Sequence, residues 1–546
     1  MRALMQDWSL TLDKIFDHAA RWHGDREVVT RAVEGPVTRS DYATLHRRAK
    51  QVSHGLLEMG IRPGDRVATM GWNSNRHLEV WYGAIGIGAV LHTLNPRLFP
   101  EQIVYIANHA ADTVLFADPA CAPLLAELLP QCPTIKRVIF LSEEAPQTPF
   151  AADPYESWLS GRPTDAVWGG FDENAAAGLC YTSGTTGNPK GVLYGHRSNY
   201  LHAMMTLQPD ALNLSARDTV LLIVPMYHAN AWGVMYSAPL VGAKLVLPGQ
   251  KLDAPSLHEL IETEGVTYSA AVPTIWQMLL AHLKDTKGRL STLQRVTVGG
   301  SACPESIIRT LHDDYGVDVI QGWGMTETSP LATVSVPKRP GLSFEDSLAG
   351  KLKQGRIVGN LDLKLVDDAG LRLPHDGKTF GRLMIKGPTV ASAYYGSDHG
   401  SALDDEGFFD TGDVATLDSN GDMQITDRAK DVIKSGGEWI SSIDVENIAV
   451  GHPKAALCAV LGVLHPKWDE RPILLVQLEP GLTAEKREFL DFLEGKIARW
   501  WMPDDVVFVD EIPLGPTGKI DKKLIRQRMA DYRLPSAGEA AAAANS

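Results

Sequence analysis

The segment most able to do chemistry is 181–191, with the sequence YTSGTTGNPKG. It combines threonine and serine hydroxyls, three glycines and Lys190. Glycines let backbone N–H groups approach a phosphate, hydroxyls add donors and a lysine supplies a cation. The composition therefore predicts a loop that binds nucleotide phosphates. A solvated turn is the commoner outcome for such a stretch, but the apolar strand-like segment 175–181 and the Pro-Lys-Gly ending favour the phosphate loop.

This loop is not a Walker A motif. That motif requires GxxxxGK followed by Ser or Thr, whereas here two glycines precede the lysine at intervals of three and Gly191 follows it.

Three other residues could have a catalytic or binding role, but each also has an ordinary structural interpretation when considered alone. His228 follows the apolar stretch LLIVPMY, where a histidine is more often a satisfied core residue than a catalyst. Trp232, four residues later, fits an apolar core equally well. Lys519 stands in a charged run with Lys522 and Lys523, a pattern typical of a solvated face.

Seven segments together resemble the adenylate-forming superfamily, which contains acyl-CoA synthetases, stand-alone adenylation domains and beetle luciferases. The segments are YTSGTTGNPKG, PMYHANAW, GGSACP, QGWGMTET, FFDTGDVA, DRAKDVIKSGGEWIS and PTGKIDKK. They keep the family's order and span about residues 9–533. The strings PMYHANAWG, LVGAKLVLPG and IKSGGEWISS make the chain most similar to medium- and long-chain fatty acyl-CoA synthetases.

The resemblance implies two steps: a carboxylate attacks the α-phosphate of ATP to give acyl-AMP and pyrophosphate, and a thiol then displaces AMP. It implies that Glu327 helps to hold Mg²⁺, that Thr326 contacts the phosphates, that Asp413 accepts hydrogen bonds from the ribose hydroxyls and that Arg428 reinforces the sugar or α-phosphate. The implied ATP and AMP contacts are Thr182, Ser183, Gly184, Thr185, Thr186, Gly187, Lys190, Gly300, Ser301, Ala302, Gln321, Gly322, Trp323, Gly324, Asp413 and Arg428.

For the acid, the resemblance implies that His228 orients the carboxylate and that Trp232 gates an acyl tunnel. A carboxylate is already ionised at pH 7, so it needs no base. The implied acyl contacts are Trp232, Gly233, Gly299, Gly324 and Met325. The implied catalytic set is Lys519, His228, Thr326 and Glu327, with Lys519 entering the site only for adenylation.

The same resemblance predicts a hinge at Lys430. Rotation there would withdraw Lys519 and present another face to the coenzyme A pantetheine. The implied coenzyme A tunnel residues are Ser435, Gly436, Gly437, Glu438 and Trp439.

The elements that must position these residues follow an alternating pattern. Strand-like runs are expected at 66–71, 89–95, 113–118, 219–228, 243–248, 267–273 and 295–300, and helices at 40–59, 77–88, from Pro100 and at 256–265. For the first helix, Ser40 is the expected N-cap and Gly60 the stop. Such alternation predicts α/β layers around largely parallel sheets.

After about residue 350 the pattern changes to short strands separated by Gly and Asp turns, which predicts a small antiparallel, β-barrel-like section. We therefore predict an α/β protein with a large ATP- and acyl-binding domain, 1–427, made of two layered α/β subdomains plus that section. A hinge at 428–434 and a small mobile α+β lid domain at 435–546 follow, with a frayed tail after about 533.

Composition excludes several classes. Lys and Arg total 52 and Asp and Glu 66, a net charge of −14, which disfavours nucleic-acid binding. Five widely spaced cysteines without a CxxC pattern disfavour a disulfide framework. We see neither a secretory signal nor an 18-residue apolar stretch, so we expect a cytoplasmic protein. The resemblance to fatty acyl-CoA synthetases, which can be homodimers, favours a homodimer.

The leading hypothesis is an ATP-dependent, AMP-forming acyl-CoA ligase that uses Mg²⁺ and coenzyme A on a medium- or long-chain fatty acid. The alternatives are an enzyme that adenylates an aryl or other small acid for a carrier thiol, a luciferase-like oxygenase, and an ATP-binding regulatory protein of the same fold.

Overall fold

The computed structural model describes residues 1, 3–182, 188–428, 431–435, 438–515 and 519–534, without the side chains of residues 438 and 439. Within this part, one large sheet has nine strands and is parallel through its centre. In spatial order these are β16 (Arg356–Ile357), β15 (Leu331–Val334), β14 (Asp318–Gly324), β13 (Arg295–Val298), β12 (Tyr268–Ala271), β10 (Thr219–Leu221), β11 (Lys244–Leu247), β1 (Glu27–Arg31) and β2 (Val37–Asp41).

A second sheet has seven strands in the same described part and is parallel except for its last pair. Its order is β7 (Asp153–Pro154), β6 (Arg137–Phe140), β5 (Val114–Ala117), β3 (Arg66–Met70), β4 (Val90–Thr93), β8 (Ala176–Thr182) and β9 (Lys190–Gly195). Its central strands β4 and β5 are buried along their whole length. Burial on both faces is why they read as continuous apolar runs.

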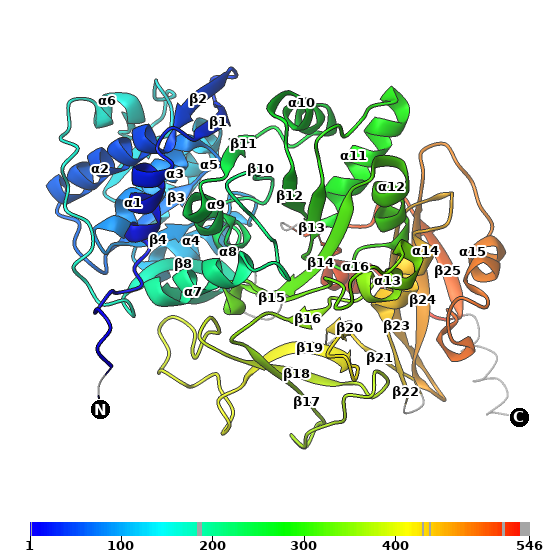
Figure 1. The fold of residues 1–546 in the computed structure, drawn as a ribbon. Coiled ribbons are helices and arrows are strands. Elements are labelled where there is room, and N and C mark those ends of the chain that lie inside the picture. The colour runs from blue at the N-terminus through cyan, green and yellow to red at the C-terminus, as the bar shows by residue number, and fades with distance from the viewer. Residues whose placement is uncertain (2, 183–187, 429–430, 436–437, 516–518, 535–546) are drawn as a thin grey trace, which may run out of the picture.

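Helices cover these sheets, as Figure 1 shows in its blue, cyan and green parts. They are α1 (Asp13–Trp22), α2 (Tyr42–Glu58), α3 (Asn75–Gly86), α4 (Pro100–Ala110), α5 (Ala122–Leu128), α6 (Tyr155–Leu159), α7 (His196–Thr206), α8 (Ala229–Trp232), α9 (Val234–Val241), α10 (Ala254–Glu264), α11 (Pro273–Thr286), α12 (Glu305–Tyr315) and α13 (Phe344–Lys351). In the described ranges, no helix is long and apolar enough to cross a membrane.

Two local predictions are wrong. Ser40 pairs with Val28 in the β1–β2 ladder, so Asp41 is the N-cap of α2 and its carboxylate accepts from the Thr44 amide at 2.7 Å. The run 219–228 is a strand only to Leu221.

Beyond β10, the chain is held by the buried Asn73 side chain. Its amide nitrogen donates to the carbonyls of Leu222 and Val224, and its oxygen accepts from the Met226 amide. These bonds replace sheet pairing and lead the chain away from the sheet toward His228.

A third, four-stranded sheet lies beside the large sheets (yellow-green to yellow in Figure 1) and confirms the predicted change to antiparallel pairing. It comprises β17 (Asp362–Val366), β18 (Gly381–Lys386), β19 (Phe409–Leu417) and β20 (Met423–Arg428).

The C-terminal part is a separate α+β unit, drawn in orange and red in Figure 1. Its sheet contains β21 (Ile433–Ser435), β22 (Glu438–Ile440), β23 (Ala455–His465), β24 (Asp469–Leu478) and β25 (Asp505–Val509). Its helices are α14 (Ser442–Ala449), α15 (Lys486–Leu493) and α16 (Lys522–Arg528). Its apolar side chains form their own cores, as expected of a small domain.

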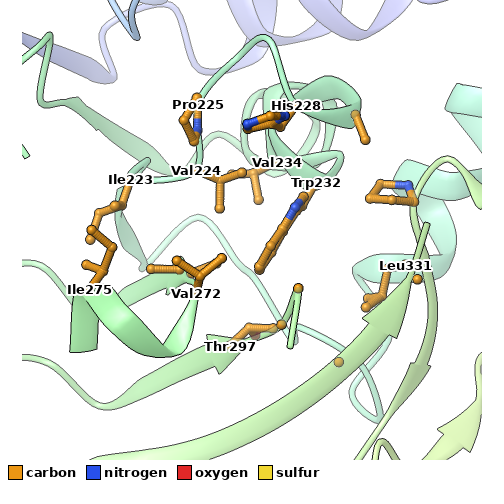
Figure 2. Close-up of a pocket in the computed structure, with 18 of the residues that line it drawn as sticks. Ile223, Val224, Pro225, His228, Trp232, Val234, Val272, Ile275, Thr297 and Leu331 are labelled. Carbon is orange, nitrogen blue, oxygen red and sulfur yellow. The ribbon is translucent and has the colours of Figure 1, made fainter. Parts of the chain in front are cut away.

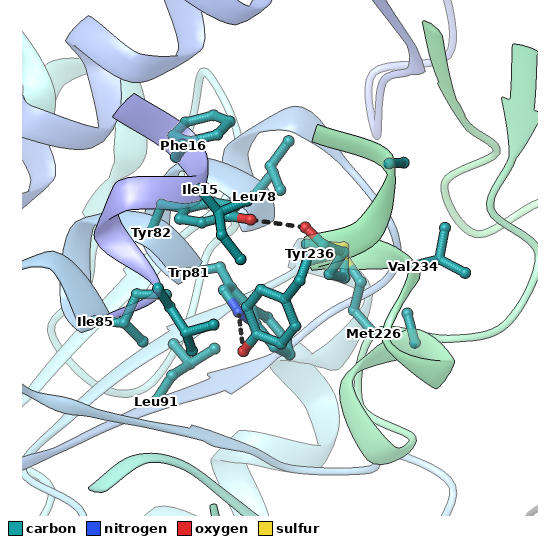
Figure 3. Packing of buried hydrophobic residues seen from close by; sticks show 14 of the residues in the cluster. Ile15, Phe16, Leu78, Trp81, Tyr82, Ile85, Leu91, Met226, Val234 and Tyr236 are labelled. Carbon is teal, nitrogen blue, oxygen red and sulfur yellow. Dashed lines mark hydrogen bonds between the residues drawn. The ribbon is translucent and has the colours of Figure 1, made fainter. Parts of the chain in front are cut away.

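The two large sheets share a core in which α1, α3 and α9 meet (Figure 3). The Phe16 and Tyr82 rings stack with centroids 4.1 Å apart. The Tyr82 hydroxyl donates to the Met235 carbonyl at 2.8 Å, and the Trp81 indole donates to the Tyr236 hydroxyl at 3.0 Å. These contacts fix α9, which directly follows the turn that carries Trp232.

Candidate active site

An apolar pocket of about 250 Å³ lies between β12, β13, β14, α8 and the start of α11. Figure 2 shows the walls formed by Ile223, Val224, Val272 and Ile275, with Trp232 extending between them. The full lining is Arg97, Leu212, Ile223, Val224, Pro225, His228, Ala229, Trp232, Val234, Leu252, Tyr268, Ala270, Ala271, Val272, Thr274, Ile275, Thr297, Gly299, Gly300, Gly322, Trp323, Gly324, Met325, Thr326, Pro330, Leu331 and Lys519.

Trp232 is presented by a left-handed turn. Ala229, Asn230, Ala231 and Trp232 have φ of 37°, 57°, 48° and 55°, and Gly233 follows at 80°. Left-handed backbone costs about 1–2 kcal/mol per non-glycine residue, so the surrounding contacts must hold this turn in place.

The Trp232 indole packs over the backbone of two glycines. A Cβ at Gly299 would lie 3.1 Å from the ring, and one at Gly300 would lie 3.8 Å from it. Glycine at these positions therefore lets a large flat side chain lie directly on the pocket floor.

Three side chains of basic residue types line this mostly apolar pocket: His228, Lys519 and Arg97. Burial, with the nearby charges of Lys519 and Arg97, lowers the pKa of His228 to about 4, so the ring is neutral at pH 7. Lys519 is an exposed residue that lines the pocket, and the neighbouring protein atoms partly desolvate its ammonium group. This desolvation, together with the charge of Arg428, lowers the Lys519 pKa to about 8 despite the attraction of Asp413.

Arg97 is a site residue that the sequence reasoning missed. It follows β4 in the LNPRLFP stretch, more than a hundred residues from the other cations of the pocket. No local signal distinguishes it from a surface arginine, because its place in the pocket depends on how the two sheets pack.

The predicted ribose site is formed by a cross-strand pair. Asp413 on β19 stands opposite Arg428 on β20, and the guanidinium Nε lies 2.9 Å from the carboxylate. The Trp323 indole donates to the other carboxylate oxygen at 2.9 Å. Burial raises the pKa of Asp413, while Arg428, Trp323 and Lys519 oppose that shift.

The predicted phosphate and metal residues meet around Tyr394. Its hydroxyl donates to Glu327 Oε1 at 2.8 Å, and the Lys190 ammonium lies 4.7 Å from its ring centroid. Thr182 stands opposite Lys190 in the β8–β9 ladder, so the two sides of the predicted phosphate loop begin close together. The Tyr194 hydroxyl also donates to the Thr326 carbonyl at 2.8 Å, which holds the GMTET segment against β9. Tyr394 carries no recognisable sequence signal, since it lies between motifs.

Glu327 is suited to a metal bound mainly through phosphates. The residue is only 6% exposed, and burial raises the pKa of its carboxyl. Among the described residues no group of three His, Cys, Asp or Glu side chains could hold a metal by itself. Mg²⁺ commonly uses one or two carboxylates together with substrate phosphates, so this single carboxylate fits such an ion.

Several predicted residues do not line the pocket. The Gln321 side chain accepts from the Cys303 amide at 2.9 Å and donates to the Lys351 carbonyl at 2.8 Å, so it supports the 299–304 loop from behind. Gly233 packs against His202, and Ser435 is buried in the C-terminal sheet, where it accepts from Arg471. Ser301 and Ala302 also lie outside the lining.

Other predicted residues lie outside what the structure describes. These are Ser183, Gly184, Thr185, Thr186, Gly187, Lys430, Gly436 and Gly437, and the side chains of Glu438 and Trp439.

Comparisons with known proteins match most of this chain to one enzyme family. Residues 16–395 match the AMP-binding enzyme family and residues 444–519 match the AMP-binding enzyme C-terminal domain. The chain is 48% identical to the medium-chain-fatty-acid–CoA ligase of Ectopseudomonas oleovorans, covering 96% of this chain and 97% of that protein. It is 47% identical to the 3-methylmercaptopropionyl-CoA ligase of Ruegeria lacuscaerulensis (97% and 99%) and 45% identical to the long-chain-fatty-acid–CoA ligase of Thermus thermophilus (97% of each).

Among solved structures, the anthranilate CoA ligase AuaEII with anthranoyl-AMP superposes with a TM-score of 0.85 at 23% identity, covering 97% of this chain and 99% of that one. The MatB protein of Rhodopseudomonas palustris with ATP gives 0.80 at 23% identity, with 96% and 99% covered. These two likenesses concern the fold. By its family matches and its near-full-length relatives, this chain belongs to the AMP-binding enzyme family.

Proposed function

We propose that this protein is an AMP-forming acid–thiol ligase that activates a medium- or long-chain fatty acid with ATP and transfers the acyl group to coenzyme A. The observation that carries the proposal is the pocket itself. Its walls are apolar, yet His228, Lys519 and Arg97 line it, a combination that suits an alkyl chain bearing one carboxylate. The relatives named for medium-chain, long-chain and thioether acids support this choice of substrate.

The charges suit the first half-reaction, in which two anions must meet. Protonated Lys519 would bind the substrate carboxylate and the α-phosphate together, which offsets their repulsion and positions them for attack. Neutral His228 would orient the carboxylate by a hydrogen bond and take no proton.

The nucleotide would lie along the polar side of the site. Asp413 would accept the ribose hydroxyls, with Arg428 reinforcing the sugar or α-phosphate, and Thr326 and Lys190 would contact the phosphates. We also propose nucleotide contacts from the 182–187 loop and from Gly300, Gly322, Trp323 and Gly324, as predicted from the sequence. Glu327 would hold Mg²⁺, which supplies positive charge to the phosphate oxygens.

The pocket volume bears on chain length. At about 250 Å³ it is smaller than the roughly 300–1,000 Å³ usual for ligand sites. With the Trp232 indole lying over Gly299 and Gly300, this volume suits a medium acyl chain, and a longer chain requires the indole to move. Trp232 is therefore proposed as the gate of the acyl site.

For the second half-reaction we propose rotation of the C-terminal unit about Lys430 within a 428–434 hinge. The large domain would span 1–427 and the lid 435–546, with residues 435–439 lining the coenzyme A path. We also propose that the protein is cytoplasmic and forms a homodimer. Cell fractionation tests the location, and sedimentation of the purified protein tests the oligomeric state.

The test is pyrophosphate release with a panel of fatty, aryl and thioether acids, with and without coenzyme A. Fatty acyl-CoA formation supports the proposal. Adenylation of a small or aryl acid without transfer to coenzyme A would favour the alternative, an adenylating enzyme that loads another thiol.

A further inference from the structure

His202 on α7 contacts one residue of the acid-pocket lining and the turn that carries Trp232, without lining the pocket itself. The residue is only 1% exposed. Its Nε2 accepts a hydrogen bond from the amide of Leu331 at 3.0 Å, and Leu331 lines the pocket. On its other side the ring lies against Gly233, where a Cβ would come within 2.6 Å of it. One imidazole therefore connects the left-handed Trp232 turn with the start of β15.

The hydrogen bond fixes the state of the ring. Because the Leu331 amide donates, Nε2 carries the lone pair and the proton belongs to Nδ1. Nδ1 is buried and has no hydrogen-bond partner among the described residues. Burial lowers the His202 pKa to about 3, so the ring stays neutral at every physiological pH.

The same helix supports the turn at a second point. Asn199, three residues before His202 and therefore on the same face of α7, accepts from the Asn230 side-chain amide at 3.3 Å. Both asparagines are buried. The helix thus contacts the strained turn at Asn230 and at Gly233, on either side of Trp232.

We propose that His202 is a positioning residue that sets acyl-chain selectivity by holding the Trp232 turn and the Leu331 wall at a fixed separation. The proposal rests on the proposed fatty acid ligase function. It predicts that changes at His202, which touches neither acid nor nucleotide, alter which chain length is preferred.

The test compares His202→Leu with His202→Gln across straight-chain acids from four to sixteen carbons. Leucine fills the space but leaves the Leu331 amide without an acceptor, whereas the glutamine oxygen can replace Nε2. We expect His202→Leu to lower kcat/KM for the best wild-type acid at least tenfold and to shift the optimum, with the KM for ATP changed less than twofold. His202→Gln should stay within threefold of wild type and keep its optimum.

His77 supplies a matched control, since it is fully buried, hydrogen-bonded at both nitrogens and absent from the pocket lining. His77→Leu should lower the melting temperature and leave the chain-length profile unchanged. If His202→Leu behaves in the same way as His77→Leu, the proposal is overturned.

Gly233→Ala gives an independent route should His202→Leu fail to fold. The added methyl would meet the His202 ring from the other side, so the same shift in optimum is expected, and an unchanged optimum would overturn the proposal. A wild-type enzyme that converts no straight-chain acid would instead refute the proposed function.

Discussion

Different interactions hold the residues of the acid pocket and those of the proposed nucleotide side of the site. The pocket is apolar, and its key side chain stands on a strained left-handed turn held by packing from α7 and α9. The nucleotide side is polar, and its residues are held by hydrogen bonds on regular strands, as with Asp413, Arg428 and Trp323. The comparison teaches that the residues proposed to bind the nucleotide are held by backbone register, whereas Trp232, the proposed acyl gate, is held by side-chain packing.

The largest expected effect comes from Lys519, which lines the acid pocket and lies within electrostatic reach of Asp413. Lys519→Ala should reduce acyl-AMP formation by about 10²–10³-fold, the usual loss when one preorganised charge-stabilising donor is removed. Thioester formation from supplied acyl-AMP should persist. Pyrophosphate release and acyl-CoA formation measured separately distinguish the steps, and Lys523→Ala, an exposed neighbour in the same run, is the control. Equal loss of both steps would contradict a role confined to adenylation.

A change confined to the nucleotide side should affect ATP alone. Asp413→Asn weakens charge-assisted hydrogen bonds worth about 1.5–3 kcal/mol, so kcat/KM for ATP should fall roughly 10- to 150-fold. The chain-length optimum should not move. Asp410→Asn, on the same strand but exposed and paired with Arg382, should leave ATP kinetics unchanged. A shifted acid optimum in Asp413→Asn would mean that the two regions are not independent.

The kcat/KM for adenylation should fall on the alkaline side of neutral pH only. Lys519 works when protonated and its pKa is lowered to about 8, so kcat/KM for adenylation should fall about tenfold between pH 7 and pH 9. The His228 pKa is about 4, so no second limb is expected between pH 6 and pH 8. A pH profile of pyrophosphate release in wild type measures this. A rise in activity across pH 7–9 would show that the lysine charge is not required.

The smallest effect should appear on the acid side. Trp232→Ala should move the chain-length optimum by changing kcat/KM up to about fourfold per methylene, with the KM for ATP nearly unchanged. Trp158→Ala, a buried tryptophan on α6, should only lower the melting temperature. If Trp232→Ala also lowers stability and leaves the profile intact, Trp232 is core and not a gate.

Sequence reasoning succeeded where local pattern determines structure. Apolar runs and turn residues located most strands, because burial and side-chain periodicity act within a few residues. The motif order also predicted a common site for Lys519, His228 and Asp413, and the structure places Lys519 within electrostatic reach of the other two; their roles stay predictions.

It failed where the outcome depends on distant contacts. The left-handed backbone of the Trp232 turn, opposed by the intrinsic preferences of Ala and Trp, exists because α7 and α9 hold it. The end of β10 is set by Asn73, about 150 residues away. Tertiary contacts alone bring Arg97, Tyr394 and His202 to the site. A single sequence carries no signal for such contacts.

The most direct test of the central claim is the wild-type response to chain length. If the acid lies in an apolar pocket lined by Lys519 and His228, kcat/KM for acyl-CoA formation should rise up to about fourfold with each added carbon and then level off where the chain reaches Trp232. A flat response across straight-chain acids, with strong activity on a small or aromatic acid, would contradict the account.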